Sequence, residues 1–203
     1  MEERNIGYDL VIDEIPEGSR VLDLGCGDGS LLKLLQEKKH VTGFGVEISE
    51  EGVSLCMEKG VYCYQADIDE GLSDYRENSF DYVILNQTIQ NTKQPDFVIR
   101  EVLRIGKMAI ISFPNFGYYR TRAYLMFRGT MPVNELLPYE WYNSPNIHLL
   151  TINDMIKMSS DFSFRIISQK HFSLARDDKS SIVRMRPNLV AQYGFFVITS
   201  VKG

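Results

Sequence analysis

Short apolar segments alternate with amphipathic stretches of helix length along most of the chain. Several of the apolar segments are hydrophobic almost throughout, which is typical of strands covered on both faces of a sheet. Alternating strands and helices indicate βαβ units around a parallel sheet. The pattern predicts a Rossmann-like α/β fold, with helices on both faces of a seven-stranded, mostly parallel sheet. The seven expected strands are residues 20–24, 41–48, 61–68, 80–85, 107–113, 164–172 and 194–201.

The expected helices carry recognisable end signals. Ser49 is a typical N-cap, and Gly60 suits the position just beyond the helix that follows it. Thr151 and Asp154 form a start that resembles a capping box. The sequence therefore predicts helices over residues 30–39, 49–60, 94–106 and 118–129, and a further one beginning at residue 151.

Composition and charge exclude several classes of protein. The chain has 203 residues, with 22 Lys and Arg against 27 Asp and Glu, which gives a net charge of −5. This length and a hydrophobic content of 44% are typical of one globular domain. The acidic balance argues against a nucleic-acid partner, because phosphate contacts need a surplus of basic residues. We expect a single domain over residues 1–203 with neither a nucleic-acid nor a membrane partner.

The cysteines and the N-terminal residues favour a cytoplasmic protein. Cys26, Cys56 and Cys63 are odd in number and contain no C-x-x-C pair, so the spacing indicates neither a disulfide framework nor a metal site. No run approaches the ~20 apolar residues of a membrane span, and the N-terminal residues do not have the pattern of a signal peptide. We therefore expect reduced thiols and a cytoplasmic location.

Residues from about 114 to 150 form an insertion of unusual composition. The first 32 of them, from Pro114 to Pro145, hold four of the seven prolines and eight of the 23 aromatic residues. Such segments between strands are typically functional loops or caps. Arg120, Arg122 and Arg128 lie on the helix predicted within it, and they form either a solvated basic face or, together with the aromatic residues, a docking surface.

The most specific local feature is the glycine-rich turn in RVLDLGCGDGS, where an apolar strand leads into Gly25, Gly27 and Gly29. Such turns let a ligand approach backbone N–H groups at a helix start. The spacing does not match the dinucleotide pattern G-x-G-x-x-G, and Asp23 would repel a pyrophosphate. An NAD-dependent oxidoreductase is therefore disfavoured. An ammonium and a sulfonium would instead be attracted, and S-adenosylmethionine carries both.

Two further acids follow at the ends of the next two predicted strands. Glu47 can accept hydrogen bonds from both ribose hydroxyls, and Asp67 can accept from an adenine amino group. Taken singly, Asp23 could be a turn residue, Glu47 a solvated strand end and Asp67 a helix cap. The ordered set, placed where open α/β sheets bind ligands, favours a nucleoside ligand.

The motifs DLGCGDG, GVEI, QADI and FDYVILNQTIQ resemble those of class I S-adenosylmethionine-dependent methyltransferases over residues 20–113. Together with SFPNFGYYRTR, PYEWYNSPNIHLLTI and RPNLVAQYGFFVI, they resemble the methionine biosynthesis protein MetW family across nearly the whole chain. This resemblance implies the class I methyltransferase fold, S-adenosyl-L-methionine or S-adenosyl-L-homocysteine as ligand, and homoserine O-acyltransferase as partner. We expect the cofactor site to contain Asp23, Gly25, Cys26, Gly27, Glu47, Ile48, Asp67, Ile68 and Asn86.

The sequence identifies no methyl acceptor. Asn86-Gln87-Thr88 replaces the N-P-P-[YF] motif used on amide and adenine nitrogens, so those acceptors are disfavoured. His148 is a candidate general base, and the alternative is a histidine that packs the insertion or caps the helix that follows. Tyr118 could line an acceptor pocket or be buried against the neighbouring helix. His171 has charged neighbours in the sequence and is expected to be exposed.

Two functional hypotheses follow. The first is a methyltransferase with an unknown acceptor. The second is a non-catalytic accessory subunit that activates the acyltransferase without transferring a methyl group. Methyl transfer from a sulfonium needs little beyond the alignment of donor and acceptor, so a missing catalytic residue does not exclude the first.

Overall fold

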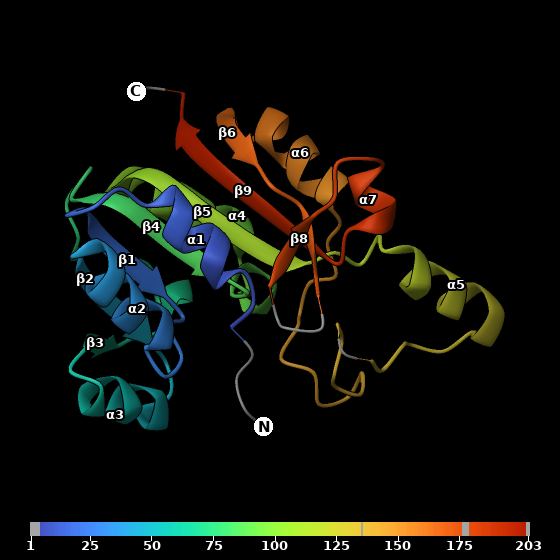
Figure 1. Cartoon of the computed structure of the whole chain (residues 1–203), viewed down its shortest axis with the longest axis horizontal. Coiled ribbons are helices and arrows are strands. Elements are labelled where there is room, and N and C mark those ends of the chain that lie inside the picture. The colour runs from blue at the N-terminus through green and yellow to red at the C-terminus, as the bar shows by residue number, and fades with distance from the viewer. Residues whose placement is uncertain (1–4, 135, 176–178, 202–203) are drawn as a thin grey trace.

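A mixed sheet runs through the middle of the molecule, with helices on both of its faces (Figure 1). The computed structural model describes residues 5–134, 136–175 and 179–201. Within these residues, the sheet contains nine strands in the order β3-β2-β1-β4-β5-β9-β7-β8, and β6 also pairs with β9. The strands are β1 (Arg20–Leu24), β2 (Thr42–Glu47), β3 (Tyr62–Gln65), β4 (Phe80–Asn86), β5 (Gly106–Pro114), β6 (Phe164–Gln169), β7 (Phe172–Leu174), β8 (Ser180–Ile182) and β9 (Tyr193–Ser200).

The predicted fold class is confirmed, with nine strands in place of seven. The strands from β1 to β5 pair in parallel, and β9 lies antiparallel to β5. The expected strand over 164–172 is two strands: β6 pairs with β9 as far as Gln169, and β7 then pairs mainly with β8. The register of β6 against β9 shifts between Ile166 and Ser168, and such a bulge bends a strand. Periodicity alone does not predict this change of partner.

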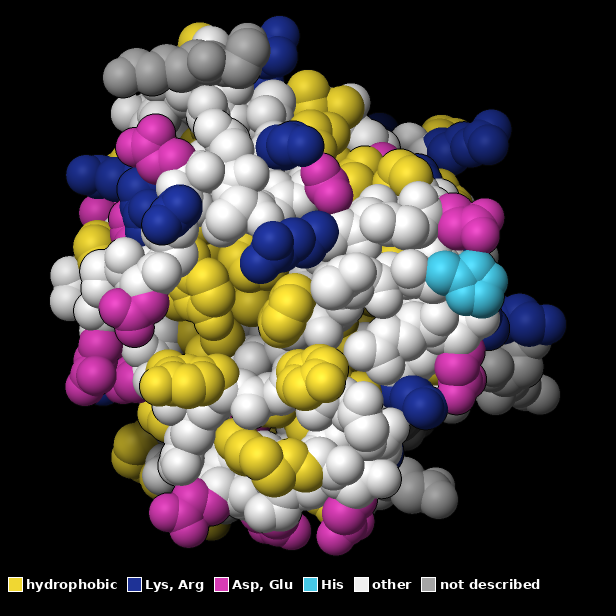
Figure 2. All heavy atoms as spheres, turned by 90° about the vertical axis from the view of Figure 1, so that its left-hand side faces the viewer, with side chains coloured by type: hydrophobic (Ala, Val, Ile, Leu, Met, Phe, Trp, Pro, Cys, Tyr) yellow, Lys and Arg dark blue, Asp and Glu magenta, His cyan; other side chains and the backbone are white. Residues whose placement is uncertain are grey.

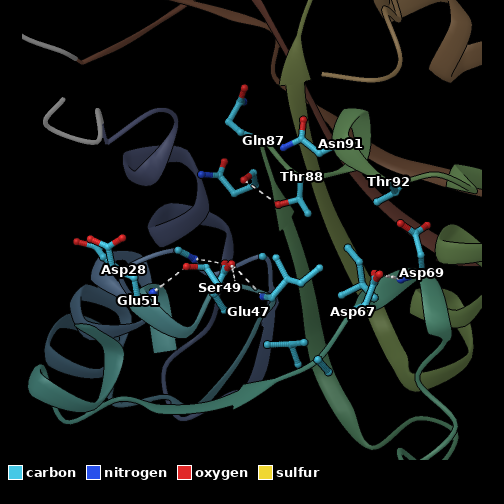
Figure 3. Close-up of a pocket in the computed structure, with 18 of the residues that line it drawn as sticks. Asp28, Glu47, Ser49, Glu51, Asp67, Asp69, Gln87, Thr88, Asn91 and Thr92 are labelled. Carbon is cyan, nitrogen blue, oxygen red and sulfur yellow. Dashed lines mark hydrogen bonds between the residues drawn. The ribbon is translucent and has the colours of Figure 1, made fainter. Parts of the chain in front are cut away.

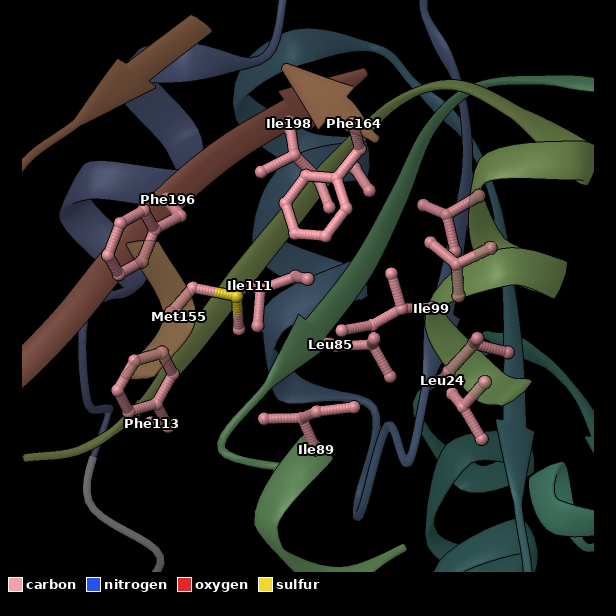
Figure 4. Close-up of a cluster of buried hydrophobic side chains, with 14 of the residues drawn as sticks. Leu24, Leu85, Ile89, Ile99, Ile111, Phe113, Met155, Phe164, Phe196 and Ile198 are labelled. Atoms are coloured by element: carbon pink, nitrogen blue, oxygen red, sulfur yellow. The ribbon is translucent and has the colours of Figure 1, made fainter. Parts of the chain in front are cut away.

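The described residues form seven helices. They are α1 (Tyr8–Glu14), α2 (Ser30–Lys39), α3 (Glu50–Glu58), α4 (Pro95–Ile105), α5 (Tyr119–Arg128), α6 (Ile152–Asp161) and α7 (Pro187–Val190), with short 3-10 turns η1 (Ile68–Glu70) and η2 (Ile89–Asn91). Buried side chains of α1, α2 and α3 belong to one hydrophobic cluster, and those of α4 and α6 to the other. Figure 4 shows the second cluster, in which Phe113, Ile111 and Phe196 of the sheet pack with Ile99 and Met155.

The predicted N-terminal caps of two helices, α3 and α6, are confirmed. The Ser49 side chain accepts a hydrogen bond from the Gly52 N–H at 3.2 Å and caps α3. Thr151 and Asp154 form a complete capping box at the start of α6. These caps satisfy backbone N–H groups that have no partner within the helix. Because α3 begins directly after β2, its first turn lies at the carboxyl end of that strand.

The side of the molecule where β4 and β5 begin is shown in Figure 2, and hydrophobic side chains gather near its middle among charged ones. At the starts of β1 and β4, the Arg20 guanidinium lies 5.4 Å from the ring centroid of Phe44 and 5.2 Å from that of Phe80. Arg20 therefore makes cation–π contacts with both rings. The candidate site lies at the opposite ends of these strands.

The predicted helix in the insertion is confirmed as α5, which stands away from the sheet (Figure 1). Its Met126 and Phe127 are 73% and 78% exposed, and Trp141 in the following loop is 75% exposed. Large apolar side chains of this kind on one segment mark a candidate interaction surface. None of the described helices combines the length and the hydrophobicity needed to cross a membrane.

Candidate functional site

The glycine-rich turn joins β1 to α2, and its backbone conformation requires glycine. Gly25 and Gly29 have φ angles of +71° and +75°, which L side chains rarely adopt. A Cβ atom on Gly25 would also lie 2.7 Å from Cγ2 of Thr88, which follows β4. The N–H groups of Gly25 and Cys26 donate to the carbonyl oxygen of Val46 at 2.8 and 3.2 Å. The turn is therefore held between the ends of β2 and β4.

Glu47 connects this turn to the start of α3. One carboxylate oxygen accepts from the Gly27 N–H at 2.9 Å, and the other accepts from the N–H groups of Ile48 at 2.9 Å and Ser49 at 3.0 Å. A carboxylate has about four lone-pair sites, so this one still has acceptor capacity for ligand hydroxyls. The hydrogen bonds fix its position before any ligand binds.

A second set of polar contacts joins the turn to the other end of α3. Lys59 donates to Asp28 and, at 2.7 Å, to the hydroxyl of Ser30. Partial burial alone would raise the pKa of Asp28, but hydrogen bonds from Lys59 and Ser30 outweigh it and hold that pKa below its usual range. The glycine turn is thus fixed to α3 at both ends of the helix.

Asp67 lies just beyond β3, where it caps the η1 turn. Its Oδ1 accepts from the Asp69 N–H at 2.9 Å, and Lys93 Nζ lies 3.4 Å from its Oδ2. Asp69 in turn accepts from the N–H groups of Lys93 and Gln94. Asp67 therefore acts as a helix cap, as the alternative interpretation predicted. It also lies at the edge of the cavity that Glu47 lines (Figure 3).

Two adjoining cavities occupy the carboxyl ends of β1, β2, β3 and β4. The first has a volume of about 780 Å³ and the second about 560 Å³, within the range of small-molecule sites. Figure 3 shows the first cavity, with Glu47 and Asp67 on one side and Gln87, Thr88 and Asn91 on the other. The residues that line both cavities are Gly25, Gly27, Asn86, Gln87, Asn91 and Tyr139.

The charges around these cavities disfavour an anionic ligand. The described residues that line the first cavity include one basic side chain, Lys93, against the five acids Asp28, Glu47, Glu51, Asp67 and Asp69. Asp23 is the acid among those that line the second cavity, and it is 2% exposed. Charges in such a sheltered setting interact more strongly than in water. Negative charge therefore borders both cavities, which disfavours a ligand that carries phosphates.

All nine predicted cofactor residues line one or both cavities. Glu47, Ile48, Asp67 and Ile68 border the first, and Asp23 and Cys26 border the second. Ile48 is 62% exposed, so it offers an apolar surface to a flat ring. The Cys26 thiol is turned toward two other cysteines, 3.7 Å from Cys56 Sγ and 3.5 Å from Cys63 Sγ.

Several lining residues were not predicted. Gln87 has a φ of +59°, which is uncommon for a residue other than glycine and typical of functional sites. Its Nε2 donates to the Ser112 hydroxyl at 2.9 Å, and that hydroxyl donates to Asn86 Oδ1 at 2.5 Å. Asn86 Nδ2 donates to the carbonyl oxygen of Ile6 at 3.2 Å, which brings the N-terminal segment to the second cavity. No local sequence signal marks these contacts.

The insertion supplies one side of the second cavity. Its residues there are Pro114, Leu136, Pro138, Tyr139, Pro145 and Asn146. The insertion therefore contributes to the wall of this cavity, although α5 itself is not among the lining elements. The prolines restrict the backbone and so limit the shapes this wall can take.

The two candidate catalytic residues lie apart from the cavity walls. His148 is half-buried beside Phe116, Leu137 and Leu149, and its Nε2 is buried without a hydrogen-bond partner among the described residues. Tyr118 is 9% exposed, and burial raises the pKa of its hydroxyl. These positions agree with the packing alternatives, and neither side chain lines the two cavities. Their catalytic roles remain predictions.

The expectation that His171 is exposed is wrong. It is 5% exposed, its Nε2 lies 3.1 Å from Gln169 Oε1, and its ring packs edge-on against Phe196. Charged sequence neighbours suggested exposure, but the short connection between β6 and β7 places the ring against Phe196 of β9, and this tertiary contact buries it.

Comparison with known proteins identifies a family and individual relatives of this chain. The profile of the family described as methionine biosynthesis protein MetW matches residues 6–198. A bifunctional methionine biosynthesis protein MetXA/MetW from Rhodopirellula baltica is 35% identical over 160 residues, which cover 74% of this chain and 26% of the relative. A demethylmenaquinone methyltransferase from Oceanobacillus iheyensis is 30% identical over 59% of this chain and 56% of its own length. The chain thus spans about a quarter and about half of these two relatives.

Solved structures confirm the fold at low sequence identity. An S-adenosylmethionine-dependent methyltransferase from Mesorhizobium loti has a TM-score of 0.69 at 18% identity, covering 95% of this chain and 96% of the other. A methyltransferase of the same class from Archaeoglobus fulgidus has a TM-score of 0.66 at 15% identity, covering 94% and 93%. At this identity the likeness establishes the fold alone. Because the family profile spans nearly all of the sequence, the chain belongs to the methionine biosynthesis protein MetW family and has the class I methyltransferase fold.

Proposed function

We propose that this methyltransferase-like protein of methionine biosynthesis binds S-adenosyl-L-methionine across the two adjoining cavities and acts together with homoserine O-acyltransferase. The observation that carries the ligand assignment is the placement of Glu47 and Asp23 on either side of the glycine turn, one in each cavity. A nucleoside with a cationic tail matches this arrangement of acceptors and charge.

The adenosine half fits the first cavity. Glu47 has acceptor capacity for the ribose hydroxyls, and its position is fixed by three backbone N–H groups. Ile48 and Ile68 offer apolar contacts to the adenine, with Asp67 at its edge. A purine ring gains most of its affinity from such apolar contacts and from a few well-placed polar groups.

The methionyl half fits the second cavity. The carboxylate of Asp23 is nearly buried there and attracts an ammonium and a sulfonium. When bound, S-adenosylmethionine supplies an electrophilic methyl group. The wall formed by Leu136, Pro138 and Tyr139 would hold the acceptor side and exclude water.

The two halves of the ligand give a sharp test of this assignment. In isothermal titration calorimetry, we expect Asp23→Asn to weaken S-adenosylmethionine binding about tenfold or more, because it removes a sheltered negative charge. Methylthioadenosine lacks the amino-acid part, so its affinity should change less than about twofold. The control Glu37→Gln removes an exposed acid of α2 and should alter neither affinity. Equal losses for both ligands, or no loss for either, would contradict the assignment.

Methyl transfer and an accessory role remain the two functional candidates. The titratable side chains among the described residues of the second cavity are Asp23, Cys26 and three tyrosines, Tyr8, Tyr139 and Tyr193, with no histidine or lysine. An acceptor that needs a general base would therefore find few candidates, and this observation favours the accessory role. Methyl transfer without a general base needs only an acceptor that is already nucleophilic.

The partner proposal rests on the family and on one exposed surface. The relative named MetXA/MetW carries two activities in its name, and α5 of this chain projects with Met126 and Phe127 largely exposed. Aromatic residues, methionine and arginine are enriched at interfaces, and α5 contains all three types. We propose that the acyltransferase docks on α5.

Co-expression with homoserine O-acyltransferase tests both points. We expect the two chains to elute together, and the double variant Met126→Ser, Phe127→Ser to reduce co-elution at least tenfold. Met185→Ser, which changes another exposed methionine, is the control. If acyl-transfer activity persists with the variant Asp23→Asn, Glu47→Ala, the accessory role is favoured over methyl transfer. Independent elution of the two chains would remove the partner proposal.

A further inference from the structure

All three cysteines of the chain lie together beneath the glycine-rich turn. They come from three elements: Cys26 from the turn, Cys56 from α3 and Cys63 from β3. Cys26 Sγ lies 3.7 Å from Cys56 Sγ and 3.5 Å from Cys63 Sγ, and the three sulfur atoms all lie within 4.8 Å of one another. The sequence does not reveal this cluster, because its cysteines form no C-x-x-C pair.

The space occupied by the sulfur atoms depends on two glycines. A Cβ atom on Gly45 of β2 would lie 2.5 Å from Cys26 Sγ, and one on Gly29 would lie 2.8 Å from Cys56 Sγ. Both distances are far below ordinary contact, so a larger residue at either position would displace a thiol. The backbone is therefore shaped to bring the three thiols together.

The distances suit a metal ion. In the plane of three atoms that are 3.5, 3.7 and at most 4.8 Å apart, the equidistant point lies no more than about 2.4 Å from each. This is close to the Zn–S bond length of ~2.3 Å. Three sulfur ligands without a carboxylate select soft cations over Mg²⁺ or Ca²⁺. Cys63 is partly exposed and gives the ion a path from solvent.

We propose that Cys26, Cys56 and Cys63 form a binding site for a soft divalent metal ion of the Zn²⁺ type. On binding, three S–H bonds break, three metal–sulfur bonds form, and three protons leave to solvent, with no change of oxidation state. The resulting centre has a net charge of −1, against −2 for a monovalent copper ion, so the divalent ion is favoured beside Asp23. Such an ion would join the glycine turn to α3 and β3.

The thiols must lose protons for this to happen. Burial raises the pKa of Cys26 and Cys56, that of Cys56 to about 12, so both are thiols at neutral pH in the metal-free protein. Metal affinity should therefore rise with pH and proton release should accompany binding. Neither effect depends on S-adenosylmethionine, so the site can be tested separately from the proposed function.

The test is a titration of the fully reduced chain with Cd²⁺, then with Zn²⁺ in competition, after confirming three titratable thiols. We expect one ion per chain, a thiolate-to-cadmium charge-transfer band, and release of close to three protons in weak buffer. Excess Mg²⁺ should not displace Cd²⁺. Stoichiometric Zn²⁺ should also raise the melting temperature.

Cys63→Ser is the variant of choice, because this thiol is partly exposed and the fold should tolerate the change. We expect it to lower Cd²⁺ affinity at least a hundredfold and to release fewer protons. Met57→Leu, which removes an exposed sulfur from α3 next to Cys56, should leave binding unchanged. Wild-type affinity in Cys63→Ser, or no uptake of Cd²⁺ by the reduced chain, would each overturn the proposal.

Discussion

At the scale of single residues, His171 shows how burial couples stability to pH. It lies between β6 and β7, and burial lowers its pKa to about 4 from the usual 6.5. Its Nδ1 faces the N–H of Phe195 at 3.5 Å, which suits a neutral ring. Below pH 6.5 the unfolded chain takes up a proton at this residue and the folded chain does not. Lowering the pH therefore decreases the stability of the folded chain until the pH falls below the folded-state pKa.

The variant His171→Asn should remove this dependence, because its side chain keeps an acceptor and does not titrate. We expect wild type to lose about 2 kcal/mol more than the variant in the free energy of unfolding between pH 7 and pH 5. Urea denaturation at the two pH values measures the difference. His40→Asn changes a histidine that is 72% exposed in its side chain and should keep the wild-type dependence. Parallel curves for wild type and His171→Asn would contradict the expectation.

The residues of the candidate site could be predicted from the sequence only in part. Asp23, Glu47 and Asp67 were identified because each follows an apolar segment, and strand ends meet at one edge of a parallel sheet. Gln87, Tyr139 and Ile6 reach the same cavities through a left-handed backbone, an irregular loop and the N-terminal segment. Those contacts depend on tertiary structure, which no local pattern encodes.

At the scale of elements, the turn between β1 and α2 combines conformational and steric demands. Gly25 and Gly60 both have φ near +70°, but a Cβ on Gly25 would meet Thr88, whereas one on Gly60 would meet nothing within 4 Å. Comparing alanine substitutions at the two positions therefore separates the free-energy cost of the left-handed backbone angle from that of the steric contact with Thr88. Gly60 follows α3 and lines neither of the two cavities.

We expect Gly60→Ala to lower the free energy of unfolding by about 1 kcal/mol, the cost of a left-handed alanine. Gly25→Ala should lower it by about 2 kcal/mol or more, because Thr88 must also move. It should weaken S-adenosylmethionine binding at least tenfold, whereas Gly60→Ala should not. Urea denaturation and calorimetry measure both effects, and equal behaviour of the two variants would show that the contact with Thr88 has no energetic consequence.

Elements of regular pattern were predicted well, and those set by pairing partners were not. The helices α2, α3 and α4 follow apolar stripes and end signals, and their observed bounds differ from the predicted ones by at most two residues. The single strand expected over 164–172 becomes β6 and β7, because the chain exchanges its contacts with β9 for contacts with β8. A strand of only three residues such as β8 leaves too short a pattern to detect.

At the scale of the whole molecule, distant parts of the chain are tied to one sheet. Glu14 of α1 lies 2.8 Å from Lys170 Nζ, and Asp9 accepts from the N–H and hydroxyl of Ser180 at 3.0 and 2.6 Å. The N-terminal helix is thus bound to residues that lie more than 150 positions further along the chain. Such long-range contacts favour a single cooperative unfolding transition, in line with the predicted single domain.

A ligand that binds only the folded chain should shift that transition as a whole. At a concentration 100 times its dissociation constant, S-adenosylmethionine should stabilise the protein by about 2.7 kcal/mol, or roughly 5–10 °C in melting temperature for a chain of this size. ADP presents the same nucleoside with a negatively charged tail, which would enter the second cavity, so Asp23 should oppose it and the shift should be below about 1 °C at equal concentration. Differential scanning calorimetry compares the two ligands on one sample. Two separate transitions would contradict the single domain. A shift with ADP as large as that with S-adenosylmethionine would show that the site recognises adenosine without regard to charge, which contradicts the roles given to Asp23 and its acidic neighbours.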